Sequence, residues 1–104
     1  NALMLRHVLA FNAEAARDHY AELARIIVPG FDDKGSQGGA ALLIERLHEL
    51  ATRSGLQLRL RDHGLGFDEA PLLAREAMKQ TRLLVNNPVE ITEADARRLY
   101  EAAW

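Results

Sequence analysis

The run ALMLRHVLAF, from Ala2 to Phe11, is apolar on every side when it is drawn as a helix, and this property constrains the fold most. A helix on the surface of a globular protein carries an apolar stripe on one side only. A helix without a polar face must be surrounded by other parts of a protein. We therefore expect protein on all sides of this helix.

The start of the run has a second peculiarity. No Ser, Thr or Asp precedes the apolar residues as a helix cap, and position 1 is Asn rather than Met. Four short amphipathic helices would enclose the first helix only in part. We therefore interpret residues 1–104 as a single helical domain that is a piece of a longer protein.

Apolar residues recur at helical spacing in most of the remaining chain, which predicts an all-α fold of about five helices. Asn12 is expected to cap a second helix, which begins at Ala13 and ends before Pro29. The third helix is expected to be the longest, from about Gln37 to Arg53, and Gly55 is expected to end it in a left-handed conformation.

Two further helices are expected in the second half of the chain. Asp68 is a candidate cap for the first of them, and Pro71 would be tolerated because it falls in the first turn. Thr92 and Asp95 have the spacing of a capping box at the start of the last helix. Between the third and fourth helices, residues 56–61 alternate Leu with polar side chains, which predicts a short extended segment packed across the helices.

Composition limits the classes of function. Thirteen Lys and Arg stand against 15 Asp and Glu, for a net charge of −2, so we expect no nucleic-acid partner and no anionic membrane surface. The first apolar run has ten residues, and a membrane-spanning helix needs about 20. No export signal is recognisable. Cysteine is absent, which is consistent with the reducing cytoplasm where we place the protein.

The four histidines do not predict a metal site within the chain. No two of them are three or four residues apart, as two ligands on one helix face would be. Glu45 and His48 match half of a di-iron motif, but the other ligands of such a site are not identifiable. We interpret the imidazoles as solvated or hydrogen-bonded groups; they are His7, His19, His48 and His63.

Three other features of the sequence do not predict a functional site. Arg6 and His7 could face a cleft, but we favour a polar edge at which the first helix meets solvent. The stretch GFDDKGS has the order Lys-Gly-Ser rather than Gly-Lys-Ser, and Asp32-Asp33 lacks the pattern of a calcium loop, so we expect a flexible surface connection. Asp18-His19 and Asp62-His63 are sequence neighbours that point in different directions, so neither predicts a catalytic dyad.

Both ends of the chain resemble one enzyme family. NALMLRHVLAFNAEAARDHYAELAR resembles the segment of iron-containing (group III) alcohol dehydrogenases that reads His-Gly-x-x-Asn-Ala-x-x-Leu-Pro-His-Val-x-x-Phe-Asn. LRDHGLGFDEAPLLAREAM and NNPVEITEADARRLYEAAW resemble the closing segments of that family, Leu-Arg-Asp-x-Gly and Asn-Pro-Arg-x-x-Thr-x-x-Asp. The resemblance covers essentially the whole chain in one order. Maleylacetate reductases are close relatives and an alternative.

The resemblance implies the C-terminal helical domain of a dehydroquinate synthase-like fold, in a parent enzyme with an N-terminal α/β domain that binds NAD(P). It further implies Fe²⁺ or Zn²⁺ held by one Asp and three His, and hydride transfer between an alcohol or aldehyde and the nicotinamide. The last His ligand of the family precedes the Asn that corresponds to Asn1. None of the four histidines is therefore carried over as a ligand, and no catalytic, cofactor-binding or metal-binding residue is expected within the chain.

The chain departs from the family pattern at two positions. Arg6 replaces a Pro, and Val89 replaces the Arg of Asn-Pro-Arg. Leu83 falls where some relatives place a pocket-lining side chain, although we favour core packing for it. We expect the chain to form a helical wall of the cleft, and to be inactive and without a bound cofactor when it is alone. Its expected partner is its own N-terminal domain, and the parent enzyme is expected to be a homo-oligomer. The rival hypothesis is a stand-alone helical protein-interaction module.

Overall fold

The computed structural model describes residues 2–28, 30 and 38–104. All regular structure within these residues is helical, without a strand, which confirms the all-α fold class. The elements are α1 (Ala2–Asn12), α2 (Arg17–Ile27), α3 (Gly39–Arg53), η1 (Leu60–His63), η2 (Phe67–Glu69), α4 (Ala70–Ala77), α5 (Thr81–Leu84) and α6 (Glu93–Ala102), of which η1 and η2 are 3₁₀ helices. The four-residue α5 is not predicted by the helical periodicity of the sequence.

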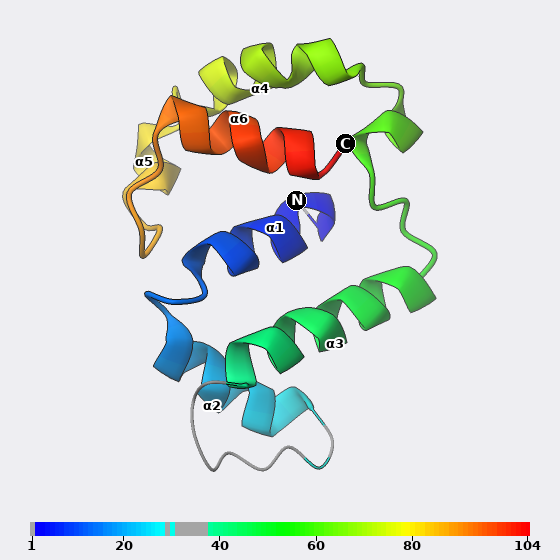
Figure 1. Cartoon of the computed structure of the whole chain (residues 1–104), viewed down its shortest axis with the longest axis vertical. Helices are drawn as coiled ribbons and strands as arrows, with labels where there is room; N and C mark the ends of the chain where they lie inside the picture. The colour runs from blue at the N-terminus through cyan, green and yellow to red at the C-terminus, as the bar shows by residue number, and fades with distance from the viewer. Residues whose placement is uncertain (1, 29, 31–37) are drawn as a thin grey trace.

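Helix α1 lies in the middle of the molecule, with α2 and α3 on one side and α4 and α6 on the other (Figure 1). Within each pair the two helices pack on one another, and α1 contacts both α3 and α6. This position explains why Ala2–Phe11 has no polar face. The described elements still leave one side of α1 open, because 41% of Leu5 remains exposed to solvent.

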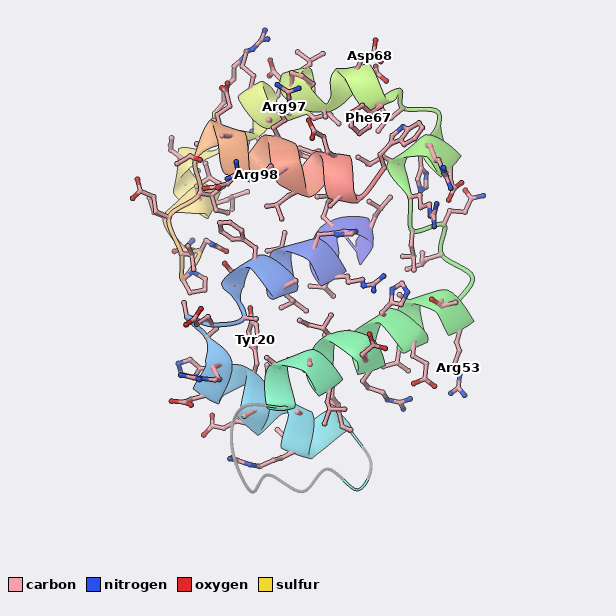
Figure 2. The ribbon with its side chains drawn as sticks, viewed as in Figure 1. Tyr20, Arg53, Phe67, Asp68, Arg97 and Arg98 are labelled. Atoms are coloured by element: carbon pink, nitrogen blue, oxygen red, sulfur yellow. The ribbon has the colours of Figure 1, made fainter. Side chains whose placement is uncertain are left out.

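Small side chains dominate the core between α2 and α3. The buried cluster consists of Ala16, Tyr20, Ala24, Ala40 and Leu43, and Tyr20 projects from α2 toward α1 (Figure 2). The helices approach closely at Gly39, where a Cβ atom would lie 2.7 Å from the Cα and 2.8 Å from the Cβ of Ala21. A glycine is therefore required sterically at the start of α3.

Two of the predicted helix ends are confirmed. Gly55 has φ of +84° and follows α3, whose last carbonyls accept hydrogen bonds from the N–H groups of Gly55 and Leu56. This is the left-handed C-terminal motif that glycine favours. At the start of α6, the Thr92 hydroxyl accepts a bond from the Asp95 N–H, and the Asp95 carboxylate accepts one from the Thr92 N–H. Two otherwise unpaired donors are thereby satisfied.

Two predicted caps are wrong. Asn12 is the last residue of α1, a turn follows over residues 13–16, and α2 begins only at Arg17. Asp68 lies inside η2, where it is the Glu69 carboxylate that accepts a bond from the Gly66 N–H at 2.6 Å. Pro71 does fall in the first turn of α4, as expected.

The predicted extended segment is correct only for its first part. Residues 56–59 have no helical structure, but Leu60 and Arg61 already belong to η1. Leu60 is buried, and its N–H donates a 2.9 Å hydrogen bond to the Ala103 carbonyl. The segment is thus fastened to the C-terminus instead of to a second strand. No helix among the described residues has the length and apolarity to cross a membrane.

Candidate functional site

A cleft with a volume of about 690 Å³ lies between α1, α3, residues 56–62 and the C-terminus. We call it the α1–α3 cleft. Sites for small molecules usually occupy about 300–1,000 Å³, so this cleft has the size of a binding site. Its apolar lining includes Leu3, Leu5, Leu47, Leu56, Leu58 and Trp104, and its charged or titratable lining is Arg6, His7, His48, Arg59 and Asp62.

His7 on α1 and His48 on α3 meet at this cleft. Partial burial holds the pKa of His7 below its usual value, and the Arg6 guanidinium and His48 lower it further. The neutral form of the imidazole is therefore favoured. Arg6 and His7 both line the cleft, and Arg6 is exposed while His7 is half-buried, so the pair lies at an edge where α1 meets both solvent and the cleft.

The residues described do not fit an iron site. Among them, no three His, Cys, Asp or Glu side chains come close enough together to hold a metal ion. His19 is exposed on α2, and His63 is an exposed residue of η1 whose Nε2 lies 3.0 Å from the Gln57 carbonyl oxygen. Metal chemistry is consequently not assigned to any residue of this part of the chain. Asp32-Asp33 lies outside the described residues.

A reciprocal amide pair that no sequence pattern indicates joins two distant parts of the chain. The Asn12 side chain, only 3% exposed, donates to Asn87 Oδ1 at 2.7 Å, and Asn87 Nδ2 donates back to Asn12 Oδ1 at 2.8 Å. Asn87 Nδ2 also donates to the Val89 carbonyl at 2.6 Å. We call this the Asn12–Asn87 clasp. It fixes the loop after α5 to the end of α1.

The clasp lies next to an apolar part of the surface. Leu83 on α5 is 68% exposed and Val85, directly after this helix, is 78% exposed. The core packing that we favoured for Leu83 is therefore wrong for the described chain. At position 89 it is the backbone carbonyl of Val89 that accepts the bond from Asn87, so this contact does not depend on the side chain.

Trp104 closes one wall of the α1–α3 cleft. Its indole N–H donates a 2.9 Å hydrogen bond to the Leu65 carbonyl, and its ring meets that of Phe67 edge to face, with centroids 5.6 Å apart. The Arg61 guanidinium lies 5.4 Å from the centroid of the indole. An aromatic residue near the end of a chain carries no pattern that would have predicted these partners.

Comparison with known families gives a match over the whole chain. The family described as "Fe-containing alcohol dehydrogenase family, C-terminal" matches residues 1–104. The chain belongs to the iron-containing alcohol dehydrogenase family. The resemblance inferred from the two ends of the sequence is thereby confirmed, and the six α-helices of the described residues are part of the C-terminal domain of such a dehydrogenase.

Three relatives within the iron-containing alcohol dehydrogenases align with all 104 residues. Lactaldehyde reductase of Escherichia coli (strain K12) is 29% identical, 1,3-propanediol dehydrogenase of Citrobacter freundii is 26% identical, and long-chain-alcohol dehydrogenase 1 of Geobacillus thermodenitrificans (strain NG80-2) is 24% identical. The chain spans 27%, 27% and 26% of their respective lengths. It is similar to about a quarter of each enzyme.

Proposed function

We propose that the 104 residues are the C-terminal helical part of a longer, metal-dependent and NAD(P)-linked alcohol dehydrogenase. The enzyme interconverts a small alcohol and its aldehyde by hydride transfer to or from the nicotinamide. The observation that carries this proposal is the family match over residues 1–104, by a chain that spans only about a quarter of its relatives. The substrates in the names of the relatives support a primary alcohol or an aldehyde.

The chemistry is divided between this chain and the residues that precede it. We place the metal ligands and the nucleotide-binding loops in the upstream part, as the resemblance to the family implies. Within the described residues, no three His, Cys, Asp or Glu side chains lie close enough together to hold a metal ion. The present chain supplies helical walls that exclude water from the substrate. Leu83, with 68% of its surface uncovered, provides an apolar wall for the carbon chain of the substrate. The clasp holds this wall in place through Asn87.

The test is an activity assay of the full-length protein. After reconstitution with Fe²⁺ or Zn²⁺, we expect NADH or NADPH to be oxidised with lactaldehyde, a long-chain aldehyde or the aldehyde of 1,3-propanediol, and a chelator to abolish the reaction. The 104-residue chain alone should be inactive under the same conditions. A gene that encodes only these 104 residues, or a metal-loaded full-length protein that is inactive with all of these carbonyl compounds, would contradict the proposal.

The role of Leu83 has its own test. Leu83→Ala should raise KM for a long-chain alcohol more than for a three-carbon one, because the removed methyl groups contact only the longer chain. The matched control is Leu72→Ala, at another exposed Leu, on α4 and 50% exposed. An equal change in KM for both alcohols would exclude Leu83 from the pocket.

A further inference from the structure

The 104-residue chain exposes more surface than a complete domain of its mass. Its accessible area is 7077 Å², whereas a folded monomer of its mass exposes roughly 5,800 Å². Its radius of gyration is 14.7 Å, compared with about 13 Å for a compact domain of this length. The excess of roughly 1,200 Å² exceeds the ~800 Å² that each partner buries in a stable interface.

The α1–α3 cleft is the hollow part of this uncovered surface. Large apolar side chains remain open there: Leu5 is 41% exposed and Leu56 is 48% exposed. A volume of 690 Å³ corresponds to roughly one and a half turns of a helix about 10 Å wide. No described strand edge borders the cleft. A segment that enters it must therefore satisfy its own backbone hydrogen bonds, as a helix does.

The charges of the cleft favour an acidic occupant. Arg6 and Arg59 line it, and neither forms an ion pair in the described part of the chain. Asp62 is the acidic residue among the lining side chains. A carboxylate placed between the two guanidinium groups would gain charge-assisted hydrogen bonds, and it would raise the pKa of nearby His7.

The position of the termini indicates where the occupant belongs. The first turn of α1 contributes Leu3 to the cleft, and the C-terminal Trp104 lines the same cleft. In Figure 1 the start of α1 lies near the C-terminus, in agreement with the shared lining of Leu3 and Trp104. Polypeptide that precedes α1 in the full-length enzyme would consequently enter the structure beside the cleft.

We propose that the α1–α3 cleft is the docking site for an amphipathic helix of the upstream polypeptide, which presents apolar side chains to Leu5 and Leu56 and a carboxylate to Arg6 and Arg59. The inference rests on the proposed function, since it requires the longer chain. It assigns the uncovered side of α1 to a contact within one polypeptide. The occupant is neither a second copy of the protein nor a free ligand.

The test uses photo-crosslinking in the full-length protein. A photoreactive amino acid replaces Gln57, which lines the cleft and is exposed. The control position is Ile26 on α2, which is 78% exposed and does not line the cleft. We expect Gln57 to cross-link to an upstream peptide of the same chain and Ile26 to give no such product. Isotope-labelled and unlabelled protein are mixed, so that mass spectrometry separates cross-links within one chain from cross-links between copies.

Charge reversal provides an independent measurement. Arg6→Glu combined with Arg59→Glu should cause loss of the Gln57 cross-link, whereas Arg53→Glu should leave it unchanged. Arg53 is exposed near the end of α3, outside the cleft lining (Figure 2). If the double variant does not fold, the cross-link from Gln57 in the protein with native arginines still tests the docking proposal.

Each outcome of the cross-linking has a defined meaning. Products between copies, or no protein product from Gln57, would overturn the docking proposal. A cross-link within one chain to a peptide without an acidic residue would overturn its electrostatic part. Dehydrogenase activity is measured on the same preparations. Activity without the cross-link rejects the docking site alone, and the cross-link without activity rejects the proposed function alone.

Discussion

The Asn12–Asn87 clasp should contribute measurably to the free energy of unfolding. Asn12→Ala removes two hydrogen bonds, each worth about 0.5–1.5 kcal/mol net, and leaves Asn87 partly accessible to water. We expect a loss of about 2 kcal/mol. Asn87→Ala removes the same two bonds and the one to Val89, and it strands the amide of Asn12, which is 3% exposed. Because a buried unsatisfied amide costs about 1–3 kcal/mol, we expect about 3 kcal/mol for this variant.

Urea denaturation of the 104-residue chain, followed by far-ultraviolet circular dichroism, measures these differences. The double variant should lose less than the sum of the two single variants, with a coupling energy of about 1–2 kcal/mol. Asn86→Ala is the matched control, since Asn86 is exposed and its side chain donates a hydrogen bond to the nearby Arg82 carbonyl. Additive effects, or a larger loss for Asn12→Ala than for Asn87→Ala, would refute the reasoning from burial.

Three further predictions concern local features. Gly39→Ala should destabilise the chain by about 1–3 kcal/mol because the new methyl group overlaps Ala21, whereas thermal denaturation of Gly38→Ala, where nothing lies within 4 Å of a Cβ, should show little change. Thr92→Ala should cost about 1 kcal/mol in urea denaturation through loss of the α6 cap. The pKa of His7 is lower in the folded chain than the value of about 6.5 in the unfolded chain, so its contribution to stability is complete above about pH 6.5 and declines as the pH falls toward the folded pKa. A titration followed by nuclear magnetic resonance should find the folded pKa below 6.5. His7→Gln should reduce the loss of stability at acid pH.

The sequence predicted local structure well where neighbouring residues determine it. Gly55 ends α3 because only nearby carbonyls and the backbone angle matter, and the Thr92–Asp95 box closes within one turn. Asn12 has the same capping chemistry as Thr92. Its side chain instead pairs with a residue 75 positions away, and no local pattern reveals such a partner. Capping propensity states what a side chain can bond, and tertiary packing decides which bond it makes.

The surroundings of the candidate site residues were harder to predict for a different reason. Leu83 was assigned to the core because an isolated Leu is more often buried than exposed, yet it is 68% exposed. Arg6 and His7 were expected at a polar edge in solvent, and Arg6 is exposed there, but the pattern did not show that this edge also lines the α1–α3 cleft. Neither outcome can be predicted from the local pattern, because the partners of a side chain come from distant parts of the polypeptide. Burial is a property of the whole assembly, so an apolar side chain can be exposed in one part of it and covered by another.

Helix α1 shows how burial depends on the surrounding polypeptide. Its apolar residues face α3 on one side and α6 on another, and Leu9 packs against the buried cluster around Leu43. On the remaining side Leu5 keeps 41% of its surface. Because burial of a whole Leu side chain is worth about 1.5–3 kcal/mol, covering this remainder would add about 1 kcal/mol. An apolar residue on that side is therefore favourable only when further polypeptide covers it. Such a cover accounts for the absence of a polar face on α1, although these 104 residues do not fully enclose the helix.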